Sequence, residues 1–94
     1  MFESPVVSVH IPPVLRQWTN GRAEITASGD TVGDVLQAVG REYPAVRPHL
    51  ISDAGVLAGG IAVYLGARSI GELQGLDTAV DLEEVLSILP QGNG

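Results

Sequence analysis

Apolar and polar positions alternate in the first part of the chain. The apolar side of residues 5–12 consists of Val7, Val9 and Ile11. A period of two between flanking prolines is typical of a strand that buries one face. Residues 22–28 alternate in the same way, with Ala23, Ile25 and Ala27 on one face. Since the turn signal Asn20-Gly21 precedes this second segment, the pattern predicts an N-terminal hairpin joined by a short connection.

The period changes after Thr31. The apolar positions then follow helical spacing and are Val32, Val35, Leu36, Val39 and Tyr43. Asp30 or Thr31 can cap the start of a helix, and Pro44 ends it. The sequence therefore predicts one long helix, whose apolar stripe packs across a sheet.

Further strands are predicted in the second half of the chain. Residues 61–65 alternate, and their inward side chains are Ile61, Val63 and Leu65. Gly66-Ala67 predicts a tight turn before a short strand at 68–70, and the last strand is expected at 85–89. Prolines 44 and 48 favour an irregular segment with a short helical turn near residues 46–50.

The predicted order is strand, strand, helix, strand, strand, with a small extra strand before the last one. Two strands, one long helix and further strands indicate an α+β domain, with the helix packed on one face of a four- to five-stranded sheet. The 94 residues are sufficient for one domain with a thin core.

Charge and composition narrow the function classes. The net charge is −6, and the five basic residues are all arginines that do not cluster in the sequence. Nucleic-acid binding requires a concentrated basic surface, so the composition argues against it. The absence of cysteine excludes disulfides, a cysteine nucleophile and cysteine-based metal sites. His10 and His49 are the only histidines, and no metal site is expected from them.

Neither a signal-peptide pattern nor an apolar run long enough to cross a membrane occurs in the sequence. A cytoplasmic location without membrane contact is therefore expected.

The last four residues, Gln91-Gly92-Asn93-Gly94, follow the final predicted strand and Pro90. We interpret residues 1–90 as the domain and residues 91–94 as a flexible tail. Glycine has no Cβ and adopts nearly any backbone conformation, so such a tail can enter a narrow site on another protein and present its terminal carboxylate. The alternative is an ordinary frayed chain end.

Several segments together resemble the small sulfur carriers with the ubiquitin-like β-grasp fold. This family includes the small subunit of molybdopterin synthase, the thiamine sulfur carrier and, most similar, the actinobacterial carrier of cysteine synthesis. The matching segments are 7–12, 14–16, 27–31, 61–65 and 87–90. The resemblance implies a mixed sheet in which the first and last strands lie side by side at the centre.

The resemblance also implies a function for the tail. An activating enzyme would use ATP to adenylate the carboxylate of Gly94, and sulfur would replace the adenylate to give a thiocarboxylate. Gln91, Gly92 and Asn93 would thread into the partner, and Tyr64, Leu89 and Pro90 are candidates for a partner-binding surface. The chain would be a cosubstrate with no bound cofactor, rather than an enzyme.

The implied partners are the activating enzyme and a sulfur-accepting synthase, with a tail-trimming metalloprotease as a further candidate. The acceptor pathway stays open between cysteine, a cofactor and a secondary metabolite.

One departure from the family pattern keeps a second hypothesis open. Family members end in Gly-Gly, whereas Asn93 is the penultimate residue here. A β-grasp interaction module that has lost carrier chemistry is therefore the alternative. A small hydrolase or lyase is disfavoured, because no nucleophile motif or catalytic group of residues is present.

Overall fold

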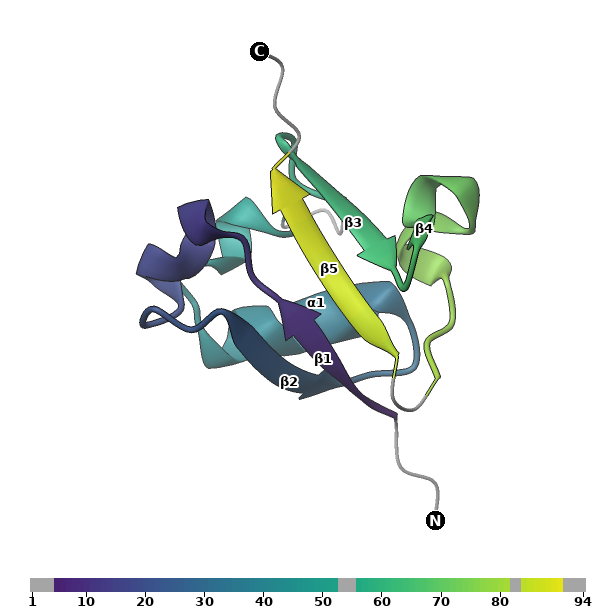
Figure 1. The fold of residues 1–94 in the computed structure, drawn as a ribbon, viewed down its shortest axis with the longest axis horizontal. Helices are drawn as coiled ribbons and strands as arrows, with labels where there is room; N and C mark the ends of the chain where they lie inside the picture. Colours follow the sequence, from purple (N-terminus) through teal and green to yellow (C-terminus); the bar gives the residue numbers. More distant parts are fainter. Residues whose placement is uncertain (1–4, 53–55, 82–83, 91–94) are drawn as a thin grey trace.

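The computed structural model describes residues 5–52, 56–81 and 84–90 (Figure 1). Its long helix is α1 (Val32–Glu42), and short 3₁₀ helices are η1 (Pro13–Trp18), η2 (Arg47–His49), η3 (Ile70–Glu72) and η4 (Gly75–Asp77). The strands are β1 (Val6–His10), β2 (Glu24–Ser28), β3 (Ile61–Leu65), β4 (Arg68–Ser69) and β5 (Val85–Pro90). The expected sequence of strands and one long helix is therefore confirmed.

The strands form one five-stranded sheet in the order β2-β1-β5-β3-β4. β1 and β5 are parallel neighbours at the centre, with Ser8 opposite Val85, and the other pairs are antiparallel. Figure 1 shows α1 across one face of the sheet, while the other face is uncovered. This is the mixed sheet of a β-grasp fold, as the sequence predicted.

The core lies between the sheet and α1. The predicted alternation in β1 is confirmed, because Val7 and Val9 are buried while His10 is exposed. The buried residues of α1 are Val32, Val35, Leu36, Val39 and Gly40. Fully burying an aliphatic side chain of this size contributes about 1.5–3 kcal/mol, so this layer is the main source of stability.

The start of α1 follows the predicted cap. The side-chain oxygen Oγ1 of Thr31 accepts a hydrogen bond from the backbone nitrogen of Asp34 at 3.2 Å. Thr31 thus satisfies one of the amide groups that a helix leaves unpaired at its start. The helix ends at Glu42, two residues before Pro44.

The connection between β1 and β2 ends in the predicted turn but also includes a helix that was not predicted. It contains the 3₁₀ helix η1, and the turn at Asn20-Gly21 comes after it with positive φ at both residues. The predicted strand 22–28 also starts too early, since β2 begins at Glu24 and Ala23 is exposed. The reason is that the backbone nitrogen of Arg22 donates to the carbonyl of Thr19 at 3.0 Å, which extends the turn.

Of the helices in the described part of the chain, none combines the length and the apolar character that crossing a membrane requires.

Candidate functional site

The end of β5 is the point from which the predicted reactive tail departs. β5 pairs with β1 only as far as Ser87, whereas its pairing with β3 continues until Pro90 faces Ile61. The central strand is thus held on both sides at its start and on one side at its end. Gln91, Gly92, Asn93 and Gly94 lie outside the described residues, so their roles stay predictions.

A hollow of about 440 Å³ lies beside Pro90. We call it the tail-root groove, and its lining residues are Val14, Leu15, Trp18, Pro48, His49, Ser52, Ala58, Gly59, Gly60, Ile61 and Pro90. Four separate parts of the chain meet here: η1, η2, the start of β3 with the segment before it, and the end of β5. The groove therefore exists only in the folded chain.

A stacked ring pair stands in the wall of this groove. The rings of Trp18 and His49 have centroids 3.9 Å apart and an interplanar angle of 15°. Trp18 is partly buried and packs against the hydrophobic core. His49 belongs to η2, which confirms the short helical turn expected near residues 46–50, whereas the contact between the two rings was not predicted.

Both ring-bearing helices are fixed to the core. η1 has Pro13 in its first turn and inserts the buried side chain of Leu15 into the hydrophobic core. Directly after it, the buried Thr19 donates its hydroxyl to the carbonyl of Arg22 at 3.1 Å. On the other side of the groove, the buried Val46 and Leu50 flank η2. The pair is therefore presented by anchored backbone.

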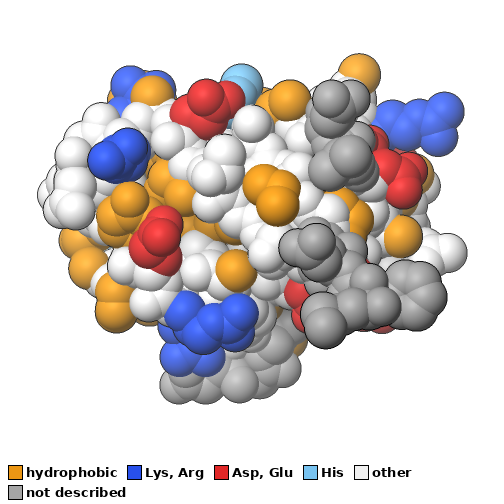
Figure 2. Space-filling view, turned by 90° about the horizontal axis from the view of Figure 1, so that it is seen from below, with side chains coloured by type: hydrophobic (Ala, Val, Ile, Leu, Met, Phe, Trp, Pro, Cys, Tyr) orange, Lys and Arg blue, Asp and Glu red, His pale blue; other side chains and the backbone are white. Residues whose placement is uncertain are grey.

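The uncovered face of the sheet carries a row of side chains that crosses all five strands. Strand register places Glu24, His10, Ser87, Tyr64 and Ser69 in one line. The exposed side chains of His10 and Glu24 are hydrogen-bonded, with 3.0 Å between Nε2 and Oε2. Ser87, Tyr64 and Ser69 carry no charge, so most charged side chains of the molecule lie outside this row. On the face seen in Figure 2, basic and acidic side chains are dispersed among neutral ones.

The three predicted partner-binding residues separate into two places. Tyr64 pairs with Ser87, and Leu89 pairs with Ala62, which puts Tyr64 and Leu89 on the uncovered face. Pro90 has the opposite parity in β5 and lines the tail-root groove. The structure thus brings Tyr64 and Leu89 together and assigns Pro90 to the adjoining groove.

Comparison with known proteins shows relatives over most of the chain. The sulfur carrier protein CysO of Mycobacterium tuberculosis is 33% identical over 86 residues, which make up 89% of this chain and 92% of the relative. A chain in the crystal structure of the Amycolatopsis orientalis BexX/CysO complex is 30% identical, with a TM-score of 0.85 over 94% of this chain and 98% of that chain. No family model matches the sequence.

The identity to CysO extends over nearly the full length of both proteins. The chain belongs to the CysO family of sulfur carriers. A further structure of the same fold is that of small archaeal modifier protein 1 from Methanosarcina acetivorans, at 27% identity and a TM-score of 0.87 over 99% of both chains. The resemblance inferred from the sequence is confirmed.

CysO membership agrees with the absence of an enzyme motif in the sequence, because these relatives are carriers. The Amycolatopsis CysO forms a complex with BexX, so a carrier of this family binds a second protein. Within the described part of the chain, no three His, Asp or Glu side chains come together as metal ligands would.

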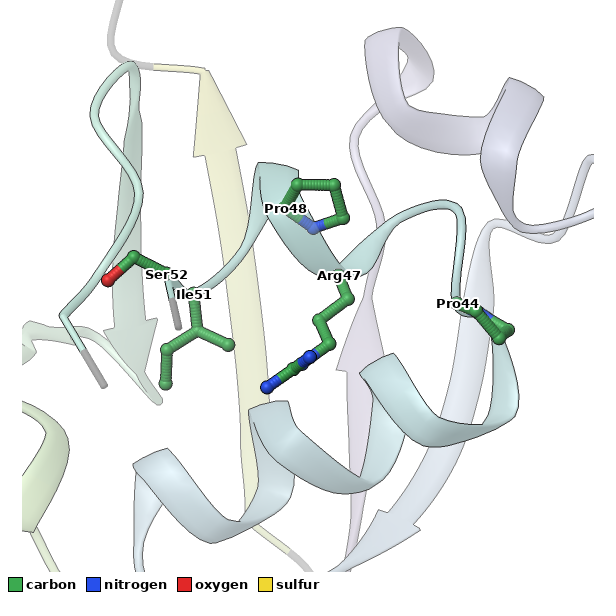
Figure 3. Close-up of a pocket in the computed structure, with 5 residues that line it drawn as sticks. All are labelled: Pro44, Arg47, Pro48, Ile51 and Ser52. Atoms are coloured by element: carbon green, nitrogen blue, oxygen red, sulfur yellow. The ribbon is translucent and has the colours of Figure 1, made fainter. Parts of the chain in front are cut away.

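A second hollow of this CysO-family fold lies behind η2, as Figure 3 shows, and is lined by Pro44, Arg47, Pro48, Ile51 and Ser52. Arg47 can pack against α1 because residue 40 is glycine. A Cβ at Gly40 would lie only 2.9 Å from Cγ of Arg47. No residue of β5 lines this hollow. The tail-root groove differs from it in that Pro90 of β5 contributes to the lining.

Proposed function

We propose that this chain is a sulfur carrier whose terminal glycine, Gly94, receives and donates the sulfur. A carboxylate oxygen of Gly94 would attack the α-phosphate of ATP in an activating enzyme and displace pyrophosphate. Sulfide would then attack the carbonyl carbon of the acyl adenylate, and AMP would leave with the bonding electrons. The product is a C-terminal thiocarboxylate, and its formation changes no oxidation state in the chain.

The single observation that carries this proposal is the position of β5 in a chain of the CysO family. β5 lies at the sheet centre, and Gly94 is four residues beyond its last residue, Pro90. The sheet thus anchors the chain a short sequence distance before the reactive group. Small tail residues, Gly92 and Gly94 among them, suit passage through a narrow channel in a partner.

Catalysis belongs to the partners in this proposal. An adenylating enzyme supplies the ATP site, and a synthase accepts the sulfur for cysteine, a cofactor or a secondary metabolite. A metalloprotease that trims the tail to Gly92 is an additional candidate partner. We place these reactions in the cytoplasm, where ATP is available.

A second candidate is an interaction module without carrier chemistry. The observation that favours it is Asn93, whose Cβ and amide group a channel shaped for two glycines could reject. The uncovered sheet face with Tyr64 and Leu89 would serve either function.

Intact-protein mass spectrometry separates the two candidates. The chain is incubated with ATP, sulfide and a purified activating enzyme of the actinobacterial carrier type. We expect the mass gain of one oxygen-to-sulfur exchange, localised to Gly94 by fragmentation. A chain without Gly94 should show no gain, and an Asn93→Gly variant serves as the Gly-Gly control. A gain in this control alone would contradict carrier function of the natural tail and favour the interaction module.

A further inference from the structure

The tail-root groove has the composition of a site for an apolar group. Among the residues that the structure describes, no Asp, Glu or Arg lines the groove, and the side chains with polar atoms are those of Trp18, His49 and Ser52. Val14 is 53% exposed at the groove, and Trp18 contributes a large ring surface. A charged group placed in these surroundings would lose hydration without gaining a charged partner.

The short distance from Pro90 to Gly94 indicates which protein can cover this groove. Gly94 lies four residues beyond Pro90, and a fully extended chain spans at most about 3.6 Å per residue, or roughly 14 Å in total. Any enzyme that acts on the carboxylate of Gly94 must therefore bring its surface within this reach of Pro90. Part of the reach is used inside the enzyme's own channel. The surface around the channel entrance must then lie against the residues beside Pro90, and these include the groove.

We propose that the tail-root groove binds an apolar side chain, aliphatic or aromatic, from the activating enzyme at the entrance of its tail channel. The stacked Trp18 and His49 form one wall of this docking site, and Val14 forms its rim. The inference rests on the proposed function, because it takes the enzyme that adenylates Gly94 as the partner.

Two features make the groove ready for such a ligand. The helices η1 and η2 are anchored by Leu15 and Leu50, so little ordering is required when a partner binds. Gly59 and Gly60 leave space at the groove, since a Cβ at either position would meet no atom within 4 Å. Trp18 is partly buried, and tryptophan is among the residue types enriched at the positions that dominate binding energy.

The test uses two matched substitutions of half-exposed valines. Val14→Asp places a charge at the groove, and Val6→Asp places the same charge at the start of β1, where 50% of the valine is exposed. Because β1 and β5 are parallel, Val6 lies beside the start of β5 and away from Pro90. Thermal unfolding of both variants checks that the fold is retained.

The rate of thiocarboxylate formation is measured against carrier concentration with the same activating enzyme, ATP and sulfide. We expect Val14→Asp to raise KM about tenfold with kcat little changed, because the introduced carboxylate loses hydration when an apolar group of the enzyme covers the rim. Val6→Asp should behave like the natural chain. Equal KM values for the two variants would overturn the inference while leaving the proposed function intact. A natural chain that is never converted would overturn the proposed function, and the inference with it.

A second measurement does not depend on formation of the thiocarboxylate. Trp18 is the only tryptophan, so the chain labelled with fluorotryptophan gives a single fluorine NMR signal from the groove. Saturating activating enzyme should shift this signal in the natural chain and also in a chain lacking Gly94. An unshifted signal in a complex shown to form by analytical ultracentrifugation would contradict docking at the groove.

Discussion

Leu86 and Leu89 belong to the same strand, β5, but lie in opposite environments. Leu86 has no exposed surface and packs in the core, whereas Leu89 is 46% exposed. Leu86 is paired with Leu65, and Leu89 is paired with Ala62 on the uncovered face. Side chains on the covered face of β5 thus stabilise the core. Side chains on the other face, together with the end of β5, stay accessible to partners.

The largest effect on stability is expected from Leu86→Ala. The substitution removes a fully buried side chain from the central strand, and comparable changes cost about 2–5 kcal/mol of unfolding free energy. Chemical denaturation monitored by circular dichroism measures the loss. Conversion of Gly94 by the activating enzyme should persist while the variant is folded. A loss below about 1 kcal/mol would contradict the assignment of Leu86 to the core.

Leu89→Ala makes the same chemical change on the opposite face and provides the matched comparison. Because Leu89 is half-exposed and leaves no closed cavity, we expect a stability change within about 1 kcal/mol. Its effect should appear in partner binding instead, as a several-fold higher KM for conversion of Gly94. A destabilisation as large as that of Leu86→Ala, with KM unchanged, would break the distinction between the two faces.

The smallest effect is expected from Glu24→Gln at the edge of the uncovered face. The contact with His10 is exposed, with 51% of the His10 side chain and 56% of the Glu24 side chain accessible, and water screens it. Exposed pairs of this kind contribute between zero and about 1 kcal/mol, so stability should hardly change. Denaturation midpoints near neutral pH, with and without added salt, check this. A large salt-dependent loss would show that the row across the sheet contributes to folding.

The sheet and α1 could be predicted because each rests on a local period. Alternation at residues 61–65 and helical spacing after Thr31 are both visible in short windows of sequence. The turn at Asn20-Gly21 was also visible, since only residues that tolerate positive φ suit it. The start of β2 was misplaced because Ala23 fits the alternating pattern although its neighbour Arg22 is bonded into the turn.

The tail-root groove could not be predicted, because its walls come from distant parts of the chain. Nothing near Trp18 in the sequence indicates that His49 will stack on it. Pro90 was predicted to share one partner-binding surface with Tyr64 and Leu89, but strand parity separates it from these two residues. Sheet register, which depends on long-range pairing, is what moves Pro90 to the groove side.

The central claim is that the sheet stabilises the fold, whereas the group that reacts is the carboxylate of Gly94. The most direct test measures thermal unfolding and intact mass on the same samples of the natural chain and a chain lacking Gly94. We predict equal unfolding midpoints, with the oxygen-to-sulfur mass gain restricted to the chain that ends at Gly94. A gain that persists without Gly94, or the absence of any gain in the natural chain with an enzyme that converts the Asn93→Gly control, would contradict the account.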